Sequence, residues 1–304
     1  MASKFKLSNP MFNGSIVALV TPFTEQGEID FAALDRLVDF HLGNGSDGLV
    51  VAGTTGESAT LSRKEFAAVL RRVIDRAGGA IPVLAGTGSA STAAATKQTE
   101  LASEYGADAA LVVTPYYNKP TQSGLEAHFT AIAEASDIAV ILYNVPSRTA
   151  VDMLPATVER LSSHARIVGI KEAVPDASRI EELCLRCGPD FTVLSGDDYS
   201  CLEAMRQGAQ GVISVAANVV PDRMHGLTEA AAQHDWSNAE RIDLGLKPLF
   251  ELLMIETNPI PVKWALFKMG LIGSRVRSPL TRLDRKFHET LRQCLIGQEL
   301  LAAR

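Results

Sequence analysis

Eight short apolar runs, each followed by a longer stretch of helical character, limit most strongly what this chain can fold into. The runs begin 20 to 34 residues apart. They cover residues 15–20, 48–52, 82–86, 109–113, 139–144, 167–172, 191–195 and 211–215. The stretches between them carry apolar residues at helical spacing, as in Phe66, Val69, Leu70 and Val73 after the cap candidate Ser62. The pattern predicts strands that alternate with helices.

The runs are continuously apolar, which is typical of parallel strands covered on both faces. Eight such units in about 200 residues match a (β/α)₈ barrel. A doubly wound open sheet is the competing fold, but the first run lacks a G-x-G-x-x-G and leads into Val20-Thr21-Pro22-Phe23. The strand pattern stops at Pro221, and two prolines, Pro259 and Pro261, interrupt the helical stretches that follow. We therefore predict an α/β (β/α)₈ barrel over residues 12–220 and a small helical C-terminal domain over residues 221–304.

Charge and hydropathy narrow the class of protein. The net charge of −6 argues against a general binder of nucleic acid or of anionic membranes. No apolar stretch approaches the roughly 20 residues that span a bilayer, and Lys4 and Lys6 are not followed by the apolar core of a signal peptide. We expect a cytoplasmic enzyme with no membrane or nucleic-acid partner.

The cysteines and histidines give little support for a metal site. Cys184 and Cys187 form a C-x-x-C spacing in a helical stretch, with no second pair to complete a zinc site. None of the six histidines falls at the end of an apolar run, where a metal-dependent aldolase would gather its ligands. We expect neither a metal nor an organic cofactor.

Reactive groups of such barrels come from the carboxyl ends of the strands and the loops after them. The sixth run is apolar until it delivers Lys171 near its end. One interpretation is that Lys171 pairs with a carboxylate, such as Glu172 or Asp197, and only stabilises the core. The other is a Schiff-base lysine, which needs a neutral amine; lowering its pKa from about 10.4 to about 7.5 costs roughly 4 kcal/mol, which burial can supply.

Polar residues also lie at or just after the ends of the second, fourth and fifth apolar runs, and each has two possible roles. Tyr143 ends the fifth run and is either a packing residue or a proton relay beside the lysine. Arg148 follows it and is either a surface charge or a guanidinium that binds a substrate carboxylate through two hydrogen bonds. The loop of residues 53–58 after the second run is either a turn with a helix cap or a carboxylate site built from hydroxyls and N–H groups. The adjacent Tyr116 and Tyr117 either pack an interface or join the site.

Taken together, these segments resemble the bacterial dihydrodipicolinate synthase family, from Phe12 into the C-terminal helices. The resemblance rests on residues 53–58, 114–118, 143–149, 169–173, 195–198 and 258–263. It implies that Lys171 forms an imine with pyruvate and that Tyr143, Thr54 and Tyr117 form a proton relay, with Tyr117 supplied by a neighbouring subunit.

The resemblance also implies the substrate contacts and the assembly. Thr55 would hold the pyruvate carboxylate, and Arg148 would receive the carboxylate of L-aspartate 4-semialdehyde. Ile213 and Gly196 would line the pyruvate pocket. The product would be a cyclic lysine precursor, and the assembly a homotetramer made of two dimers.

Two alternative functions stay open at this point. Another pyruvate-dependent aldolase, such as an N-acetylneuraminate lyase or a 2-keto-3-deoxy sugar-acid aldolase, would share Lys171 and Tyr143, although Arg148 suits a short acidic aldehyde better than a long polyol. A barrel that only binds a keto acid as a sensor would need none of the proton-relay residues.

Regulation by lysine is expected to be weak or absent. Lysine-sensitive members of the family bind lysine near the residue that matches Tyr116, through polar side chains. Phe66, Ala90 and Ala94 stand here where those members carry a histidine, an asparagine and a glutamate, so a charged ligand would find fewer partners.

Overall fold

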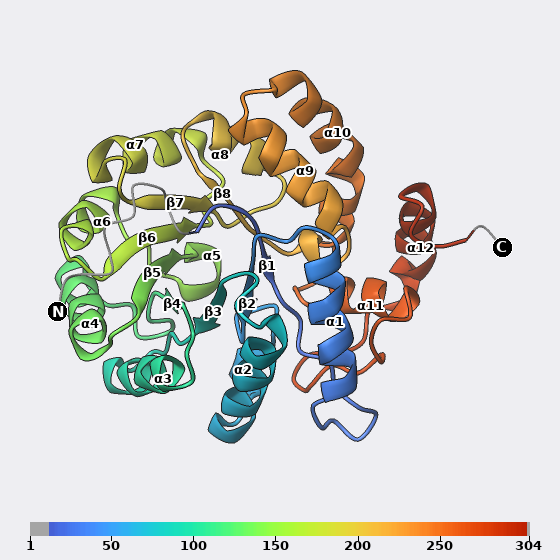
Figure 1. Ribbon diagram of the computed structural model, residues 1–304, viewed down its shortest axis with the longest axis horizontal. Coiled ribbons are helices and arrows are strands. Elements are labelled where there is room, and N and C mark those ends of the chain that lie inside the picture. The colour runs from blue at the N-terminus through green and yellow to red at the C-terminus, as the bar shows by residue number, and fades with distance from the viewer. Residues whose placement is uncertain (1–11, 303–304) are drawn as a thin grey trace.

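The computed structural model describes residues 12–302 and shows a closed barrel of eight parallel strands in sequence order. Each strand pairs with the next, and β8 closes on β1. The strands are β1 Gly14–Ala18, β2 Gly48–Val51, β3 Val83–Gly86, β4 Ala109–Val113, β5 Ala139–Asn144, β6 Ile167–Glu172, β7 Thr192–Ser195 and β8 Gly211–Ser214. The expected barrel is confirmed, as Figure 1 shows.

Helices connect the strands and cover the outside of the barrel (Figure 1). The longer ones are α1 Phe31–Gly43, α2 Arg63–Ala77, α3 Thr92–Glu104, α4 Gln122–Ala135, α6 Pro155–Ser162, α7 Ala177–Cys187, α8 Cys201–Arg206 and α9 Pro221–Ala232. Short helical turns lie in the loops at the carboxyl ends of β2, β5 and β8: η1 Ser58–Thr60, α5 Pro146–Thr149 and η2 Ala216–Asn218. These loops gather on one face of the barrel, where a site is expected.

The rest of the chain is helical, as expected, with α10 Trp236–Leu252, α11 Ile260–Lys268, η3 Arg285–Phe287 and α12 His288–Gly297. α10 packs against α9, and α11 contacts η2 near the end of β8. α9 itself contacts α8 and β1. The division at residue 220 stays a prediction, and because α9 completes the outer ring, we propose that the C-terminal part begins after it.

Three of the eight predicted strands have the bounds expected, and the others differ by one or two residues at one or both ends. The run at 15–20 ends early as a strand because the N–H of Val20 donates to the side-chain oxygen of Asn218 at 3.1 Å. The second run ends before Ala52, whose φ of +54° takes it out of the extended conformation. The last run ends before Val215, whose N–H donates to the Asp198 carboxylate at 3.0 Å.

Apolar side chains form two layers that the strands separate. One cluster lies between strands and helices, and it includes Phe66, Val69, Leu70 and Val73 of α2. The other fills the barrel interior from alternate strand positions, with one residue before β1 and one after β5 added: Phe12, Ile16, Ala18, Val50, Leu84, Ala109, Leu111, Ala139, Ile141, Tyr143, Val145, Leu194 and Ile213. Because successive strand residues point to opposite faces, this pattern fixes which residues face inward.

Local signals in the sequence explain the start of α2. The Ser62 hydroxyl accepts a hydrogen bond from the N–H of Glu65, and the Glu65 carboxylate accepts one from the N–H of Ser62. This capping box satisfies two N–H groups at the helix start.

Within the described residues, no helix is both long and apolar enough to cross a bilayer. Lys4 and Lys6 lie outside the described residues.

Candidate active site

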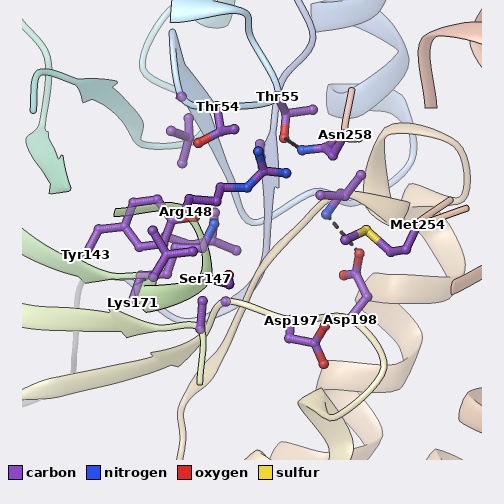
Figure 2. A pocket seen from close by; sticks show the side chains of 18 of the residues that line it. Thr54, Thr55, Tyr143, Ser147, Arg148, Lys171, Asp197, Asp198, Met254 and Asn258 are labelled. Carbon is purple, nitrogen blue, oxygen red and sulfur yellow. Dashed lines mark hydrogen bonds between the residues drawn. The ribbon is translucent and has the colours of Figure 1, made fainter. Parts of the chain in front are cut away.

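A cavity of about 150 Å³ opens at the carboxyl ends of the strands (Figure 2). It brings together seven of the eight expected site residues, all except Tyr117: Thr54, Thr55, Tyr143, Arg148, Lys171, Gly196 and Ile213. Other residues of the segments that carry the family resemblance also line it: Gly53, Val145, Ser147, Ala173, Asp197, Asp198 and Asn258. Residues that the sequence analysis did not single out for the site complete the lining: Ala18, Val50, Leu111, Tyr199, Val215, Phe250, Leu253 and Met254.

Lys171 reaches this cavity from the end of β6 and is 5% exposed. It lies opposite Tyr143 in the register of β5 and β6, and its Nζ is 4.5 Å from the centre of the Tyr143 ring. Among residues 12–302, no ion pair joins Lys171 to a carboxylate. The ion-paired interpretation with Glu172 or Asp197 is therefore wrong for this structure, and the amine is left beside the Tyr143 ring in a cavity of mixed polar and apolar lining.

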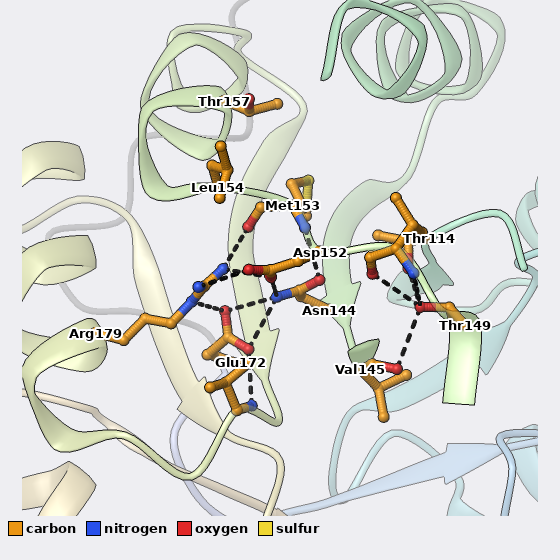
Figure 3. Close-up of polar contacts among 12 residues, drawn as sticks. Thr114, Asn144, Val145, Thr149, Asp152, Met153, Leu154, Thr157, Glu172 and Arg179 are labelled. Carbon is orange, nitrogen blue, oxygen red and sulfur yellow. Dashed lines mark hydrogen bonds and ion pairs between the residues drawn. The ribbon is translucent and has the colours of Figure 1, made fainter. Parts of the chain in front are cut away.

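Glu172 faces the other side of the barrel wall, because neighbouring residues of a strand alternate. Its carboxylate accepts hydrogen bonds from Arg179 of α7 at 2.9 Å and from Asn144 of β5 at 3.0 Å (Figure 3). Arg179 and Asn144 also donate to Asp152 at 2.7 and 2.8 Å. Burial raises the pKa of Glu172, against the lowering effect of Arg179. This network ties together the residues that directly follow Tyr143 and Lys171.

The loop after β2 presents Thr54 and Thr55 to the cavity (Figure 2). Its backbone turns tightly, since the N–H groups of Gly56 and Ser58 both donate to the carbonyl of Gly53. Asn258, from the segment before α11, donates its side-chain N–H to the Thr55 hydroxyl at 2.9 Å. The Thr55 hydroxyl therefore keeps its own proton to donate to a group in the cavity.

Arg148 sits on α5 and lines the cavity, as Figure 2 shows. The turn that carries it is held by Thr149, whose hydroxyl donates to the carbonyls of Val145 and Val151 and accepts from the Thr114 hydroxyl at 3.2 Å. A guanidinium on a fixed turn can receive a carboxylate through two parallel hydrogen bonds.

At Gly196 the chain passes close to the end of β6. A Cβ at this position would lie 2.7 Å from the Cβ of Ala173 and 3.0 Å from the carbonyl oxygen of Glu172. Only glycine therefore fits beside the cavity at this point.

Asp198 forms the cavity wall on the side of β8. One of its carboxylate oxygens accepts the N–H groups of Val215 and Ala216 at 3.0 and 2.8 Å. Its other oxygen is buried without a hydrogen-bond partner, and burial raises the pKa of this carboxyl group. Phe250 of α10 and the two residues that follow the helix, Leu253 and Met254, line the same cavity. Sequence patterns gave no sign that α10 borders the site.

Tyr117 does not line the cavity of its own chain. Its side chain is 92% exposed, and its φ of +73° is unusual for a residue with a bulky side chain. Tyr116 is also exposed and borders a second cavity of about 510 Å³, which Phe66 and Ala94 help to line.

The cysteine pair offers no reactive thiol. Cys184 and Cys187 lie on α7 as free thiols, and burial raises the pKa of both, that of Cys184 to about 11. Across residues 12–302, no group of three or more His, Cys, Asp or Glu side chains could hold a metal ion.

Known proteins resemble this chain over nearly its full length. The model of the dihydrodipicolinate synthetase family matches residues 11–297. A 4-hydroxy-tetrahydrodipicolinate synthase of Pseudomonas aeruginosa is 54% identical over 292 residues, which cover 96% of this chain and 100% of the relative.

Solved structures agree with the sequence comparison. The chloride-inhibited dihydrodipicolinate synthase of Acinetobacter baumannii, complexed with pyruvate, is 45% identical, with a TM-score of 0.94 over 95% of this chain and 99% of that one. The synthase of Cyanidioschyzon merolae, solved with lysine bound, is 39% identical, with a TM-score of 0.93 over 96% of this chain and 99% of that one.

Proposed function

The chain belongs to the dihydrodipicolinate synthetase family, and we propose from this premise that the cavity of Figure 2 is the site at which Lys171 captures pyruvate. Its activity is that of a 4-hydroxy-tetrahydrodipicolinate synthase, a lyase of the diaminopimelate route to lysine. The reaction condenses pyruvate with L-aspartate 4-semialdehyde.

The observation that carries the assignment is the setting of Lys171. The amine is buried, faces the barrel mouth and has a phenol ring rather than a carboxylate as its neighbour. An amine that no carboxylate engages, at the mouth of a barrel, is placed to attack the carbonyl of a substrate in the cavity. Glu172, the carboxylate nearest in sequence, is engaged by Arg179 on the other side of the strand.

The proposed steps balance without a further reactant. The Lys171 nitrogen attacks the keto carbon of pyruvate, and the carbinolamine loses water to give an imine. The imine withdraws electrons, so a methyl proton leaves and the resulting enamine attacks the aldehyde carbon of the second substrate. The amino group of that substrate then adds to the imine carbon, which closes the ring and releases Lys171.

Proton transfers in these steps are assigned to Tyr143 and Thr54 in the cavity and to Tyr117 of a neighbouring subunit. The exposure of Tyr117 in its own chain supports a role in another subunit's site. An assembly of at least two subunits follows from this assignment, and we propose a homotetramer composed of two such dimers.

Binding of the two carboxylates is divided between two loops. We assign the pyruvate carboxylate to Thr55, which Asn258 holds in place. The carboxylate of the semialdehyde is assigned to Arg148, with Ile213 and Gly196 as the pocket wall around pyruvate.

All four cysteines are free thiols, as is usual in a reducing compartment, so we propose a cytoplasmic location.

Lysine is proposed to inhibit this enzyme weakly or not at all. Phe66 and Ala94, which border the cavity beside Tyr116, offer no polar atom to a charged ligand. One relative, from Cyanidioschyzon merolae, was solved with lysine bound. Strong inhibition in an assay with added lysine would contradict this proposal.

A substrate comparison tests the proposed function. Purified protein is supplied with pyruvate and either L-aspartate 4-semialdehyde or a sugar aldehyde, and pyruvate consumption is followed. Pyruvate consumption is expected with the semialdehyde and not with the sugar aldehyde. Faster turnover with the sugar aldehyde would favour the sugar-acid aldolases, and binding of pyruvate without turnover would favour a sensor.

A further inference from the structure

A buried ion pair joins the C-terminal helices to the loop that presents Thr54 and Thr55. Lys263 of α11 is 2% exposed and Glu57 of the loop is 4% exposed, although 206 residues separate them. The Lys263 ammonium pairs with one oxygen of Glu57 and also donates to the carbonyl of Thr21 at 2.9 Å. The other oxygen of Glu57 accepts the N–H of Arg277 at 2.9 Å. Two points of the C-terminal segment therefore meet at one carboxylate.

Three consecutive residues of the loop are held from outside it. Thr55 accepts a hydrogen bond from Asn258, and the carbonyl of Gly56 accepts one from the Thr21 hydroxyl at 2.7 Å. Glu57 is held by Lys263 and Arg277. Residues 258–277 thus supply the contacts to two of these three loop residues.

The loop needs such contacts because its backbone is strained. Glu57 has a φ of +55°, a left-handed conformation that is unfavourable for a residue with a Cβ. Residues in this conformation persist when surrounding contacts hold them there. Removing the ion pair would let Glu57 relax, and Thr55, two residues before it, would shift with the loop.

The pair is an expensive way to stabilise a core. Two charges out of water lose hydration, and apolar side chains of similar size often stabilise a protein as well. Burial lowers the pKa of Lys263 to about 8, against the raising effect of Glu57, so the Lys263 ammonium keeps its charge for the most part at neutral pH. The presence of the Lys263–Glu57 ion pair is therefore better explained by its effect on the conformation of the loop than by a gain in stability.

We propose that the Lys263–Glu57 ion pair positions the loop so that Thr55 binds the carboxylate of pyruvate, and this rests on the function proposed above. Lys263 and Glu57 are positioning residues, since neither lines the cavity around Lys171. Arg148 is held by the separate α5 turn, whose contacts involve Val145 and Thr149. The site for the semialdehyde therefore does not depend on the pair.

The test compares the two Michaelis constants in Glu57→Gln, Lys263→Met and the double variant. Each is expected to raise the KM for pyruvate about tenfold, because pyruvate meets a misplaced Thr55. The KM for the semialdehyde is expected to stay within about twofold of wild type. A merely structural role would instead reduce the fraction of active enzyme and lower kcat with both KM values unchanged.

Arg223→Met is the matched control, because Arg223 also anchors the C-terminal segment, through hydrogen bonds to Gln298 that do not involve the loop of residues 53–58. It should leave both KM values unchanged. An unchanged KM for pyruvate in folded Glu57 and Lys263 variants, or equal rises in both KM values, would overturn the proposal. Should neither single variant fold, the double variant, which leaves no buried charge unpaired, decides by the same criterion. Failure of wild-type protein to form a pyruvate adduct on Lys171 would instead reject the proposed function.

Discussion

Lys171 and Glu172 are neighbours in sequence and face opposite sides of the barrel wall. The sequence allowed an ion pair between them, but alternation along a strand prevents it. The position of Lys171 at a strand end could be predicted from the apolar run that precedes it. The partner of Glu172 could not, because Arg179 lies on the following helix and nothing in its local sequence marks it as buried.

Tyr143 provides a prediction at the scale of one residue. Tyr143→Phe removes the hydroxyl and keeps the ring beside Lys171, so kcat should fall by about 100-fold while the fold is unchanged. Steady-state kinetics and circular dichroism measure the two effects. Tyr105→Phe, outside the barrel mouth, should stay within about twofold of wild type. Equal activity of the Tyr143 and Tyr105 variants would remove Tyr143 from the proton relay.

At the scale of elements, β5 and β6 are the strands whose ends carry Tyr143 and Lys171, and the network of Figure 3 holds them together. Their bounds were predicted correctly because continuous apolar runs end there in polar residues. Predictions were less accurate where a side chain distant in sequence ends the strand, as Asn218 does for β1. The contact between Asn258 and Thr55 was likewise not foreseen, since 203 residues separate them.

Arg179→Leu tests whether the buried network at the ends of β5 and β6 stabilises the protein. The change leaves the Glu172 carboxylate buried without its cation, so the free energy of unfolding should fall by about 3 kcal/mol. Arg186→Leu, on the same helix but in exposed ion pairs, should cost at most about 1 kcal/mol. Urea denaturation of both variants measures the difference. Similar losses in the two would show that the buried network does not hold the strand ends.

For the whole molecule, the alternation of strands and helices was sufficient to predict the barrel, because few folds bury eight parallel apolar strands. The role of the C-terminal helices could not be predicted in this way. Their helical spacing shows that they pack, but not that α10 lines the cavity or that α11 contacts the loop after β2.

Complementation between subunits tests the assignment of Tyr117 to a neighbouring site. Tyr117→Phe and Lys171→Ala should each be nearly inactive. Co-assembled dimers of the two variants contain one intact site, with Lys171 from one subunit and Tyr117 from the other, so random mixing should restore about a quarter of the wild-type activity. If Tyr117 acted within its own chain, mixing would restore nothing.

Stability of the molecule against acid should depend on His41. Burial lowers the pKa of His41 from an ordinary value of 6.5 to about 3. Below pH 6.5 the unfolded chain takes up a proton that the folded chain does not, so stability is lost as the pH falls from 6.5 towards 3. Between pH 7.5 and pH 5 the loss should be about 2 kcal/mol.

Urea denaturation at pH 7.5 and pH 5 measures this loss. His41→Gln should be less stable than wild type at pH 7.5 but lose less on acidification. His234→Gln, at an exposed position, is the control and should keep the wild-type dependence. An unchanged pH dependence in the His41 variant would show that another group governs acid stability.

Covalent capture of pyruvate by Lys171 is the central claim, and reductive trapping tests it most directly. Protein is treated with borohydride in the presence of pyruvate and the modified peptide is identified by mass spectrometry. The expected result is one adduct on Lys171, with the equally buried Lys263 unmodified as an internal control. Absence of an adduct, or an adduct on a different lysine, would contradict the account.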